Sequence, residues 1–471
     1  MTRLVWFRTD LRIHDNPALT HACRDQDDDV CAIVFNTLKQ WQQHGLGPRK
    51  INLMQAAMME LKQQLAQLNI PLAIVTVDNF ADCVSYLQQC MGSQRVSELA
   101  FNLEYEVNER KRDIVVGRWC QDHDIIVNKF HDQCLLPPGS VKTQQDEPYR
   151  VFTPFKKAWL NIVNNQFAAP LPAPAVRQHN ETAFHLLQDH TDITTQADDL
   201  WPTDEDSAHN QLNTFLDDDV LRYHEQRDLP DADATSRVSY YLSTGLLSPR
   251  QCLYSAWLKN ACLLNGGENG IDTWINELIW REFYRHLLVA YPSLCKHKAF
   301  KPHTDHVPWR NCEKDFNAWC EGKTGYPIID AAMQQLRQQG WMHNRLRMIT
   351  AMFLTKHLLI DWRMGEAFFN EYLVDADLAS NNGGWQWSAS TGADGAPYFR
   401  IFNPTTQSER FDKDGYFLIR YLPELTRLPS KSRHAPSAAE RKLCGYPAPI
   451  VDHKMARQRA LDAFKNTLEV A

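Results

Sequence analysis

The run RLVWFR, residues 3–8, is the first of five short β-rich runs that decide the fold of the N-terminal part of the chain. The others span residues 30–36, 72–78, 98–105 and 125–130, and helix-length stretches separate them. Between the second and third runs, apolar residues recur at three- and four-residue steps and give one apolar helical face: Ile51, Met54, Met58, Leu61, Leu65 and Leu68. Five strand–helix repeats predict an α/β domain with a doubly wound, Rossmann-like parallel sheet and right-handed crossovers.

Ligands of such sheets bind beyond the carboxyl ends of the strands. No G-x-G-x-x-G motif follows the first run, so the sequence disfavours a dinucleotide in the usual Rossmann position.

The remainder of the chain has a different pattern. Residues 164–205 combine the proline-rich APLPAPAV with a long acidic tract, which is typical of a surface linker. From about residue 206 the pattern is helical, and no period-two strands occur. We therefore predict an α/β domain at 1–130, an interdomain linker at 131–205 and an all-α domain at 206–471.

Length and composition agree with two globular domains. A chain of 471 residues is too long for one ordinary core, and 44% of the residues are apolar. No apolar run is long enough to cross a bilayer. The N-terminus enters a strand-like run without a charged-then-apolar leader, so we predict no secretory signal.

The twelve cysteines contain no C-x-x-C pair, which argues against a zinc ribbon or a redox dithiol. We therefore predict no metal site. Scattered cysteines in a chain without a leader indicate reduced, buried thiols and a cytoplasmic protein.

Charge is unevenly distributed along the chain. The net charge is −7, yet residues 181–235 hold 15 acidic and 2 basic residues, whereas residues 275–365 hold 13 basic and 8 acidic ones. A local basic face can bind phosphates on an acidic protein, although such a run can also be ordinary solvated surface.

The stretch DADLASNNGGWQW, residues 375–387, concentrates two acids, two amides, a glycine pair and two tryptophans. Glycines allow the backbone to approach a planar ligand closely, and carboxylates and amides can bond the edge of a flat heterocycle. The alternative is a loop between two core helices whose tryptophans only pack.

NNGGWQW, followed by STG and PYFRIFNP, resembles the flavin-binding signature of the DNA photolyase/cryptochrome family. The resemblance extends over nearly the whole chain and is weakest at 165–215 and after about 425. It is carried by VWFRTDLRIHDN, TSRVS, WINELIWREFYRH, TGYPIIDAAM and WMHNRLRM. Within the family the chain looks most similar to bacterial class I cyclobutane pyrimidine dimer photolyases with a folate antenna.

The resemblance implies an FAD cofactor, reduced and anionic when active, in the all-α domain. Its implied ligands are Tyr223, Thr235, Ser236, Arg237, Val238, Ser239, Trp274, Arg281, Asn344, Arg347, Asp375, Asp377 and Asn381. Among them, Arg347 resembles an arginine paired with Asp375, and Asn381 the residue at flavin N5. The hydroxyls of TSRVS at a helix start suit a diphosphate, although the sequence alone favours ordinary N-capping, because Ser and Thr dominate that position.

The implied substrate is a flipped-out pyrimidine dimer in ultraviolet-damaged DNA. Trp274, Glu277, Trp280, Arg281 and Tyr284 recur at three- and four-residue steps along one predicted helical side. By resemblance, Trp280 stacks on the dimer and Glu277 bonds its 5′ base. The other implied substrate residues are Asn344, Arg345, Met348 and Trp387. Repair enzymes for the six-four photoproduct have histidines where this chain has Asn344 and Met348, so we expect cyclobutane dimers as substrate.

The resemblance also implies two routes for energy and electrons. Trp309, Trp362 and Trp385 match a chain of three tryptophans that passes an electron to the flavin. His44, Asn108, Glu109, Cys295 and Lys296 match residues that hold a reduced folate, 5,10-methenyltetrahydrofolate, as antenna. A deazaflavin is the alternative antenna.

The predicted activity is therefore light-driven splitting of cyclobutane pyrimidine dimers by an electron from excited, reduced FAD. Such a protein is a carbon–carbon lyase. We expect it to be a monomer without a membrane partner. Two rivals remain: a cryptochrome-type blue-light receptor and a flavoprotein or DNA-binding module without photochemistry. Receptors commonly carry a long C-terminal tail, which the chain ending at 471 is not expected to accommodate.

Overall fold

The computed structural model describes residues 2–92, 96–178 and 193–469 and divides into two compact units. The N-terminal unit comprises Met1–Tyr149, Thr153–Leu221 and Ser236–Pro292. The C-terminal unit comprises Arg150–Phe152, Arg222–Thr235 and Ser293–Ala471.

The N-terminal unit is built on a five-stranded parallel sheet of strand order β3-β2-β1-β4-β5. Its strands are β1 Thr2–Phe7, β2 Asp29–Asn36, β3 Leu72–Thr76, β4 Val96–Asn102 and β5 Ile126–Phe130. Each strand lies within or beside one of the β-rich runs, so the predicted doubly wound sheet is confirmed. The connecting helices are α1 Pro17–Ala22, α2 Leu38–Gln43, α3 Pro48–Gln67, α4 Phe80–Gly92 and α5 Val107–Asp122.

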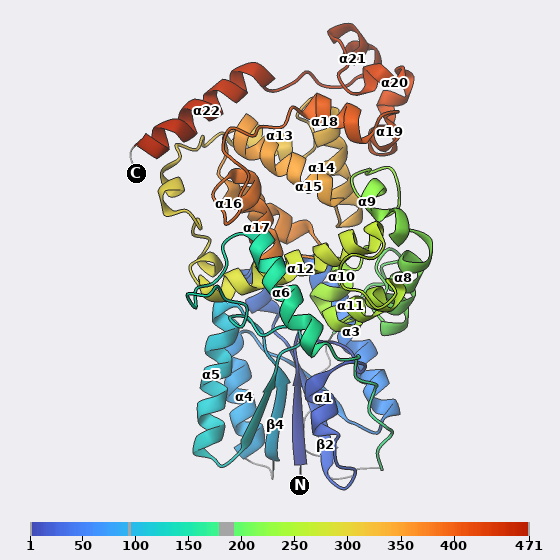
Figure 1. Cartoon of the computed structure of the whole chain (residues 1–471), viewed down its shortest axis with the longest axis vertical. Helices are drawn as coiled ribbons and strands as arrows, with labels where there is room; N and C mark the ends of the chain where they lie inside the picture. The colour runs from blue at the N-terminus through green and yellow to red at the C-terminus, as the bar shows by residue number, and fades with distance from the viewer. Residues whose placement is uncertain (1, 93–95, 179–192, 470–471) are drawn as a thin grey trace. The chain divides into compact units, whose positions relative to one another are not determined.

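The two faces of the sheet are covered by different helices. In Figure 1, α4 and α5 lie on one side and α1 and α3 on the other. On the α4/α5 side, Trp6 and Phe101 of the strands share one buried cluster with Leu87 of α4 and Val116 of α5. This burial on both faces explains why the central strands are continuously apolar.

Helices complete the N-terminal unit: α6 Phe152–Gln166, α8 Glu205–Asp218, η1 Val220–Arg222, α10 Ser239–Thr244, α11 Pro249–Lys259 and α12 Asn269–Ala290. Helix α6 lies inside the stretch 131–205 that we interpret as a linker. Residues 179–192 of the acidic tract lie outside the described residues. The boundaries at 130 and 205 stay predictions.

Glu282 of α12 anchors part of that stretch. Its buried carboxylate accepts hydrogen bonds from the backbone N–H groups of Leu135 and Leu136, both at 2.9 Å, and from Nε1 of Trp159 at 2.7 Å. One side chain therefore ties α12 to the segment after β5 and to α6.

The C-terminal unit is helical, with no strand among its described residues, as the sequence predicts. Its elements are α9 Tyr223–Gln226, η2 Leu294–Lys296, η3 Pro302–His306, α13 Glu313–Cys320, α14 Pro327–Gln339, α15 Asn344–Met352, the π-helix η4 Phe353–His357, α16 Trp362–Tyr372, α17 Leu378–Ala389, α18 Pro404–Phe411, α19 Tyr416–Tyr421, η5 Pro423–Arg427, α20 Ser430–Arg433, α21 Ala438–Cys444 and α22 His453–Glu469.

Gly245 ends α10 in the left-handed conformation, with φ at 78°. A Cβ atom there would lie 2.2 Å from the carbonyl oxygen of Thr9, in the segment after β1. Only glycine allows this turn and this close backbone approach.

All twelve cysteines lie in the described residues, and none forms a disulfide. Nine are buried, Cys295 and Cys312 are half-buried, and Cys262 is exposed. None of the helices in the described part of the chain is both long and apolar enough to cross a bilayer.

Candidate functional site

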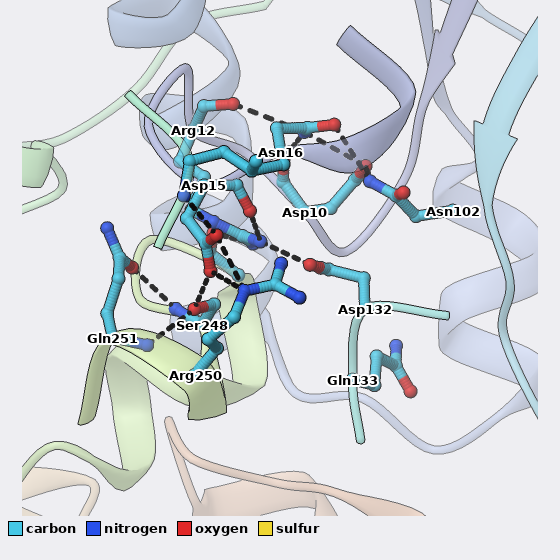
Figure 2. A network of polar contacts seen from close by, with 12 residues as sticks. Asp10, Arg12, Asp15, Asn16, Asn102, Asp132, Gln133, Ser248, Arg250 and Gln251 are labelled. Carbon is cyan, nitrogen blue, oxygen red and sulfur yellow. Dashed lines mark hydrogen bonds and ion pairs between the residues drawn. The ribbon is translucent and has the colours of Figure 1, made fainter. Parts of the chain in front are cut away.

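A buried polar network occupies the carboxyl edge of the sheet where the strand order reverses (Figure 2). The carboxylate of Asp10 accepts hydrogen bonds from the backbone N–H of Arg8 at 2.6 Å and from the side-chain amides of Asn102 at 2.6 Å and Asn16 at 3.2 Å. Burial, and then the charge of Asp132, raise the pKa of Asp10. The chain's own side chains therefore bond this carboxylate at the edge where the parallel-sheet fold places ligands.

The same network holds the motif VWFRTDLRIHDN against α11 within the N-terminal unit. Arg12 is fully buried and donates to the carbonyl oxygens of Gly245 at 3.0 Å and Asp15 at 2.6 Å. Arg250 Nε contacts Asp15 Oδ1 at 2.7 Å, and the hydroxyl of Ser248 also bonds that carboxylate. The motif therefore has a structural role that its sequence alone did not reveal.

Three of the five predicted antenna residues meet within this unit. His44 follows α2, and Asn108 and Glu109 lie in the first turn of α5. The Nε2 atom of His44 lies 3.1 Å from Asn108 Nδ2, and its Nδ1 atom lies 3.6 Å from Glu109 Oε1. Cys295 and Lys296 lie in η2 of the C-terminal unit.

Glu109 has the properties of a neutral carboxylic acid at neutral pH. Burial, followed by the charges of Glu106 and Glu104, raises its pKa to about 8. Its Oε2 atom is buried without a hydrogen-bond partner among the described residues. A protonated carboxyl group can donate as well as accept, so Glu109 suits the mixed donor–acceptor edge of a heterocycle.

The TSRVS segment precedes α10, which begins at Ser239 with Val238 as its N-cap. Val238 has no polar side chain, so the N-cap residue itself does not cap the helix through a side-chain hydrogen bond. Ser236 Oγ instead accepts a hydrogen bond from Trp274 Nε1 at 3.2 Å, and Arg237 has φ at 53°. Thr235 and Tyr223 belong to the C-terminal unit.

Helix α12 carries the predicted functional face of the N-terminal unit. Trp274 is buried, whereas Glu277, Trp280, Arg281 and Tyr284 are half-buried. The rings of Trp280 and Tyr284 lie 5.6 Å apart. The guanidinium group of Arg281 donates hydrogen bonds to the backbone oxygens of Gln133, at 2.7 Å, and Leu242, at 3.3 Å.

The stretch 375–387 is largely helical, which contradicts the alternative of a loop between two core helices. Asp377 is the N-cap of α17, and its side chain accepts from the N–H of Ser380 at 2.8 Å. A Cβ atom at Gly384 would meet nothing within 4 Å. Gly384 is exposed, so the space beside it is open at the surface of the helix.

An ion pair and an oriented amide mark the predicted flavin side of the C-terminal unit. Arg347 lies 2.8 Å from Asp375 Oδ2, which is the pairing that the resemblance implies. Asn381 donates from Nδ2 to the backbone oxygen of Glu366 at 3.0 Å. This bond leaves its Oδ1 atom as the acceptor for a ligand.

Glu366 is a residue of this site that sequence reasoning missed. Its buried carboxylate accepts from Asn382 Nδ2 at 2.8 Å and lies 2.8 Å from Nδ1 of His297. Its backbone oxygen binds Asn381, so it holds both amides of the NN pair. An acidic residue inside a helix gives no sequence signal of such a role.

The predicted substrate residues of α15 lie between its first residue, Asn344, and its middle, Met348. Asn344 is exposed and Met348 is half-buried. Arg345, expected on the DNA side, forms an ion pair with Asp228 at 2.7 Å and lies 4.7 Å from the ring centroid of Phe411.

The three tryptophans of the predicted electron route all belong to the C-terminal unit. Trp362 and Trp385 are buried. The ring centroids of Trp309 and Phe464 lie 5.9 Å apart. Trp319, which the sequence reasoning missed, lies 6.0 Å from the Trp385 ring. Trp387 is half-buried on α17.

Comparison with known families defines the class of protein first. Residues 274–466 match the model described as the FAD binding domain of DNA photolyase, and residues 3–175 match the DNA photolyase model. An α/β unit joined to such a helical region defines a flavoprotein whose cofactor is FAD.

Similarity to individual proteins is high. The chain is 47% identical to a deoxyribodipyrimidine photo-lyase of Escherichia coli K12, over 98% of both chains, and 47% identical to that of Salmonella typhimurium. Its fold matches a class III photolyase from Agrobacterium tumefaciens (TM-score 0.86, 35% identity, 99% and 98% coverage) and a Synechocystis cryptochrome (TM-score 0.84, 26% identity, 98% and 99% coverage). The chain belongs to the DNA photolyase/cryptochrome family.

Proposed function

We propose that the chain is a light-driven deoxyribodipyrimidine photo-lyase of the class I type, which splits cyclobutane pyrimidine dimers in ultraviolet-damaged DNA. The observation that carries this proposal is identity of 44–47% to three photo-lyases over 98% of this chain. Bound, reduced FAD supplies an excited electron, and the protein supplies binding, orientation and electrostatics.

The residues of the C-terminal unit fit such a cofactor. Arg347 contributes positive charge beside Asp375, which favours an anionic ligand. Asn381, with its amide nitrogen committed to Glu366, presents an oxygen that accepts a hydrogen bond from a protonated ring nitrogen. Asp375 and Asp377 bond the pyrimidine edge and the ribityl side.

The N-terminal unit contributes the diphosphate and substrate residues. Ser236, Arg237, Val238 and Ser239 lie at the start of α10, where backbone N–H groups suit phosphate oxygens. On α12, Trp280 stacks on the extruded dimer and Glu277 accepts or donates at its 5′ base. Asn344, Arg345, Met348 and Trp387 complete the proposed substrate set.

We assign the antenna site to 5,10-methenyltetrahydrofolate, with His44, Asn108, Glu109, Cys295 and Lys296 as its residues. The cluster of His44, Asn108 and Glu109 supports this assignment, because it brings a neutral acid, an amide and an imidazole together. We further propose a cytoplasmic monomer whose electron route runs through Trp309, Trp362 and Trp385.

The second candidate is a cryptochrome-type photoreceptor, which the fold match to a Synechocystis cryptochrome favours. Its identity of 26% is well below the 47% of the photo-lyases.

A repair assay distinguishes the two. Reduced, FAD-loaded protein is mixed with a thymine-dimer oligonucleotide in blue light or in darkness, and the recovery of base absorbance is followed. We expect recovery in light alone, and Trp280→Ala should weaken dimer binding about ten-fold through lost stacking. Glu371→Ala, an exposed change on α16, is the control. Absence of recovery with flavin bound and reduced would favour the receptor.

A further inference from the structure

Three side chains at the carboxyl edge of the sheet form a hydrogen-bonded chain. Thr9 follows β1, Glu104 follows β4 and Gln133 follows β5. Gln133 Nε2 lies 2.8 Å from Thr9 Oγ1, which in turn lies 2.8 Å from Glu104 Oε1. Gln133 stands beside the network of Figure 2 without belonging to its bonds.

The direction of these bonds is fixed by chemistry. Glu104 is more than nine-tenths buried. Burial raises its pKa, but the charges of Arg112 and Arg8 outweigh this effect and lower the pKa. Glu104 is therefore a carboxylate, which only accepts hydrogen bonds. Thr9 must therefore donate its single proton to Glu104. Its oxygen then accepts from Gln133, which orients that amide.

The two ends of the chain are firmly attached. Glu104 Oε2 accepts a hydrogen bond from Arg112 at 2.9 Å. Arg112 is itself buried, and its Cζ atom lies 4.6 Å from the ring centroids of both Trp6 and Phe80. At the other end, the backbone oxygen of Gln133 accepts from Arg281 at 2.7 Å. The guanidinium of Arg281 also donates to the backbone oxygen of Leu242 of α10, at a longer 3.3 Å.

Arg281 thus donates a short hydrogen bond to a residue whose own side chain is held by Thr9 and Glu104. We propose that Thr9, Glu104 and Gln133 are positioning residues for Arg281, which fix its guanidinium for binding FAD. This inference rests on the proposed function, because it takes Arg281 as a cofactor residue.

The test is a double-mutant cycle on the full chain, with the dissociation constant of FAD measured from flavin released on dilution of the holoenzyme. Thr9→Val removes the hydroxyl at nearly constant volume, and Arg281→Ala removes the positioned group. Thr9→Ser retains the hydroxyl. Thr273→Val is the matched control, because its hydroxyl donates to the backbone oxygen of Asn269 in its own helix, at 2.7 Å.

We expect Thr9→Val to raise the dissociation constant about five-fold, the equivalent of one hydrogen bond. Thr9→Ser and Thr273→Val should leave it unchanged. In the Arg281→Ala background Thr9→Val should have no further effect, since the residue that it positions is gone. Gln133→Ala should behave like Thr9→Val and provides a second variant should Thr9→Val fold poorly.

The inference would be overturned by an unchanged dissociation constant in Thr9→Val and Gln133→Ala, or by an equal weakening with and without Arg281. If Arg281→Ala itself binds FAD like the wild type, the assignment of Arg281 fails and the positioning chain fails with it. The photo-lyase proposal would stand or fall separately, by the repair assay.

Discussion

Glu109 shows how burial changes the chemistry of one side chain. Burial of its carboxyl group, together with the negative charges of Glu106 and Glu104, raises its pKa. Glu109 therefore keeps its proton at a pH at which an exposed glutamate is ionised. A carboxylate could only accept hydrogen bonds from a ligand, whereas the neutral acid can also donate one. The predicted folate site therefore contains a donor that the sequence would count as an anion.

We expect this proton to make stability depend on pH. The pKa of Glu109 is raised from 4.5 to about 8 in the folded protein. The folded state therefore binds the proton more tightly, and the stabilisation is complete below about 4.5 and lost as pH rises through about 8. Glu109→Gln abolishes this titration. Thermal unfolding at several pH values should show wild type losing several degrees relative to Glu109→Gln on going from acid to alkaline buffer.

The control for this comparison is Glu371→Gln, an exposed glutamate of α16. Its melting curve should stay parallel to that of wild type at every pH. Parallel curves for Glu109→Gln as well would mean that Glu109 is an ordinary carboxylate.

At the scale of helices, two glycines with the same backbone conformation have different surroundings. Gly245 ends α10 and Gly445 ends α21, with φ of 78° and 76°. A Cβ at Gly245 would collide with the backbone of Thr9 and Asp10, whereas at Gly445 it would meet nothing within 4 Å. The pair separates the cost of the left-handed conformation from the cost of crowding.

Gly445→Ala should lower the free energy of unfolding by about 1 kcal/mol, the conformational cost alone. Gly245→Ala should lower it by more than about 3 kcal/mol, because the backbone must also move apart. Urea denaturation measures both. Similar losses for the two variants would contradict the crowding at Gly245.

We also expect Glu282 to stabilise the junction between α12, α6 and the segment after β5. Glu282→Ala would leave two backbone N–H groups and the Trp159 indole N–H without their acceptor. We expect a loss of about 3 kcal/mol in the free energy of unfolding. Glu371→Ala should change it by less than about 0.5 kcal/mol. Equal effects of the two substitutions would show that water replaces the carboxylate.

The sequence predicts helices and strands where its apolar pattern is clear. It does not predict them where tertiary contacts determine the local structure. Short β-rich runs separated by helix-length stretches located all five strands, and the three- and four-residue steps from Trp274 to Tyr284 identified one side of α12. The stretch at the start of α17 was predicted as a ligand-binding stretch or a loop between core helices, and asparagines and paired glycines are poor helix formers. Capping by Asp377 and burial of Trp385 stabilise the helix there despite that composition.

The site was predicted to a similar degree. The motifs led to the Arg347–Asp375 pair and to the cluster of His44, Asn108 and Glu109. They did not reveal Glu366 or the Thr9–Glu104–Gln133 chain, because these depend on bonds between residues far apart in sequence. Such bonds follow from packing, which periodicity does not encode.

For the whole molecule, the distribution of charge matters more than the sum. An acidic chain of net charge −7 carries a surplus of basic residues in 275–365. If DNA binding depends on that region, its affinity for a dimer-containing duplex should fall at least about ten-fold between about 50 and about 200 mM salt, through release of counterions. Fluorescence anisotropy at several salt concentrations measures the slope. A flat salt dependence would exclude phosphate contacts as the main source of affinity.

The division into compact units was also beyond the reach of the sequence. Residues 236–292 are helical like those that follow, yet they form one compact unit with the sheet. Long-range bonds account for this, including Arg12 to Gly245 and Arg250 to Asp15. The predicted FAD residues are consequently shared by both units, with Arg281 in one and Arg347 in the other.

The cysteines give the experimenter a practical advantage. Burial raises the pKa of Cys23 and Cys90 to about 11, so such thiols hold almost no reactive thiolate at neutral pH. Cys262, in contrast, is exposed after α11, and Cys295 and Cys312 are only partly accessible. A brief treatment with a maleimide dye should therefore label Cys262 first, which gives the natural chain a fluorescent reporter without removal of its other eleven cysteines.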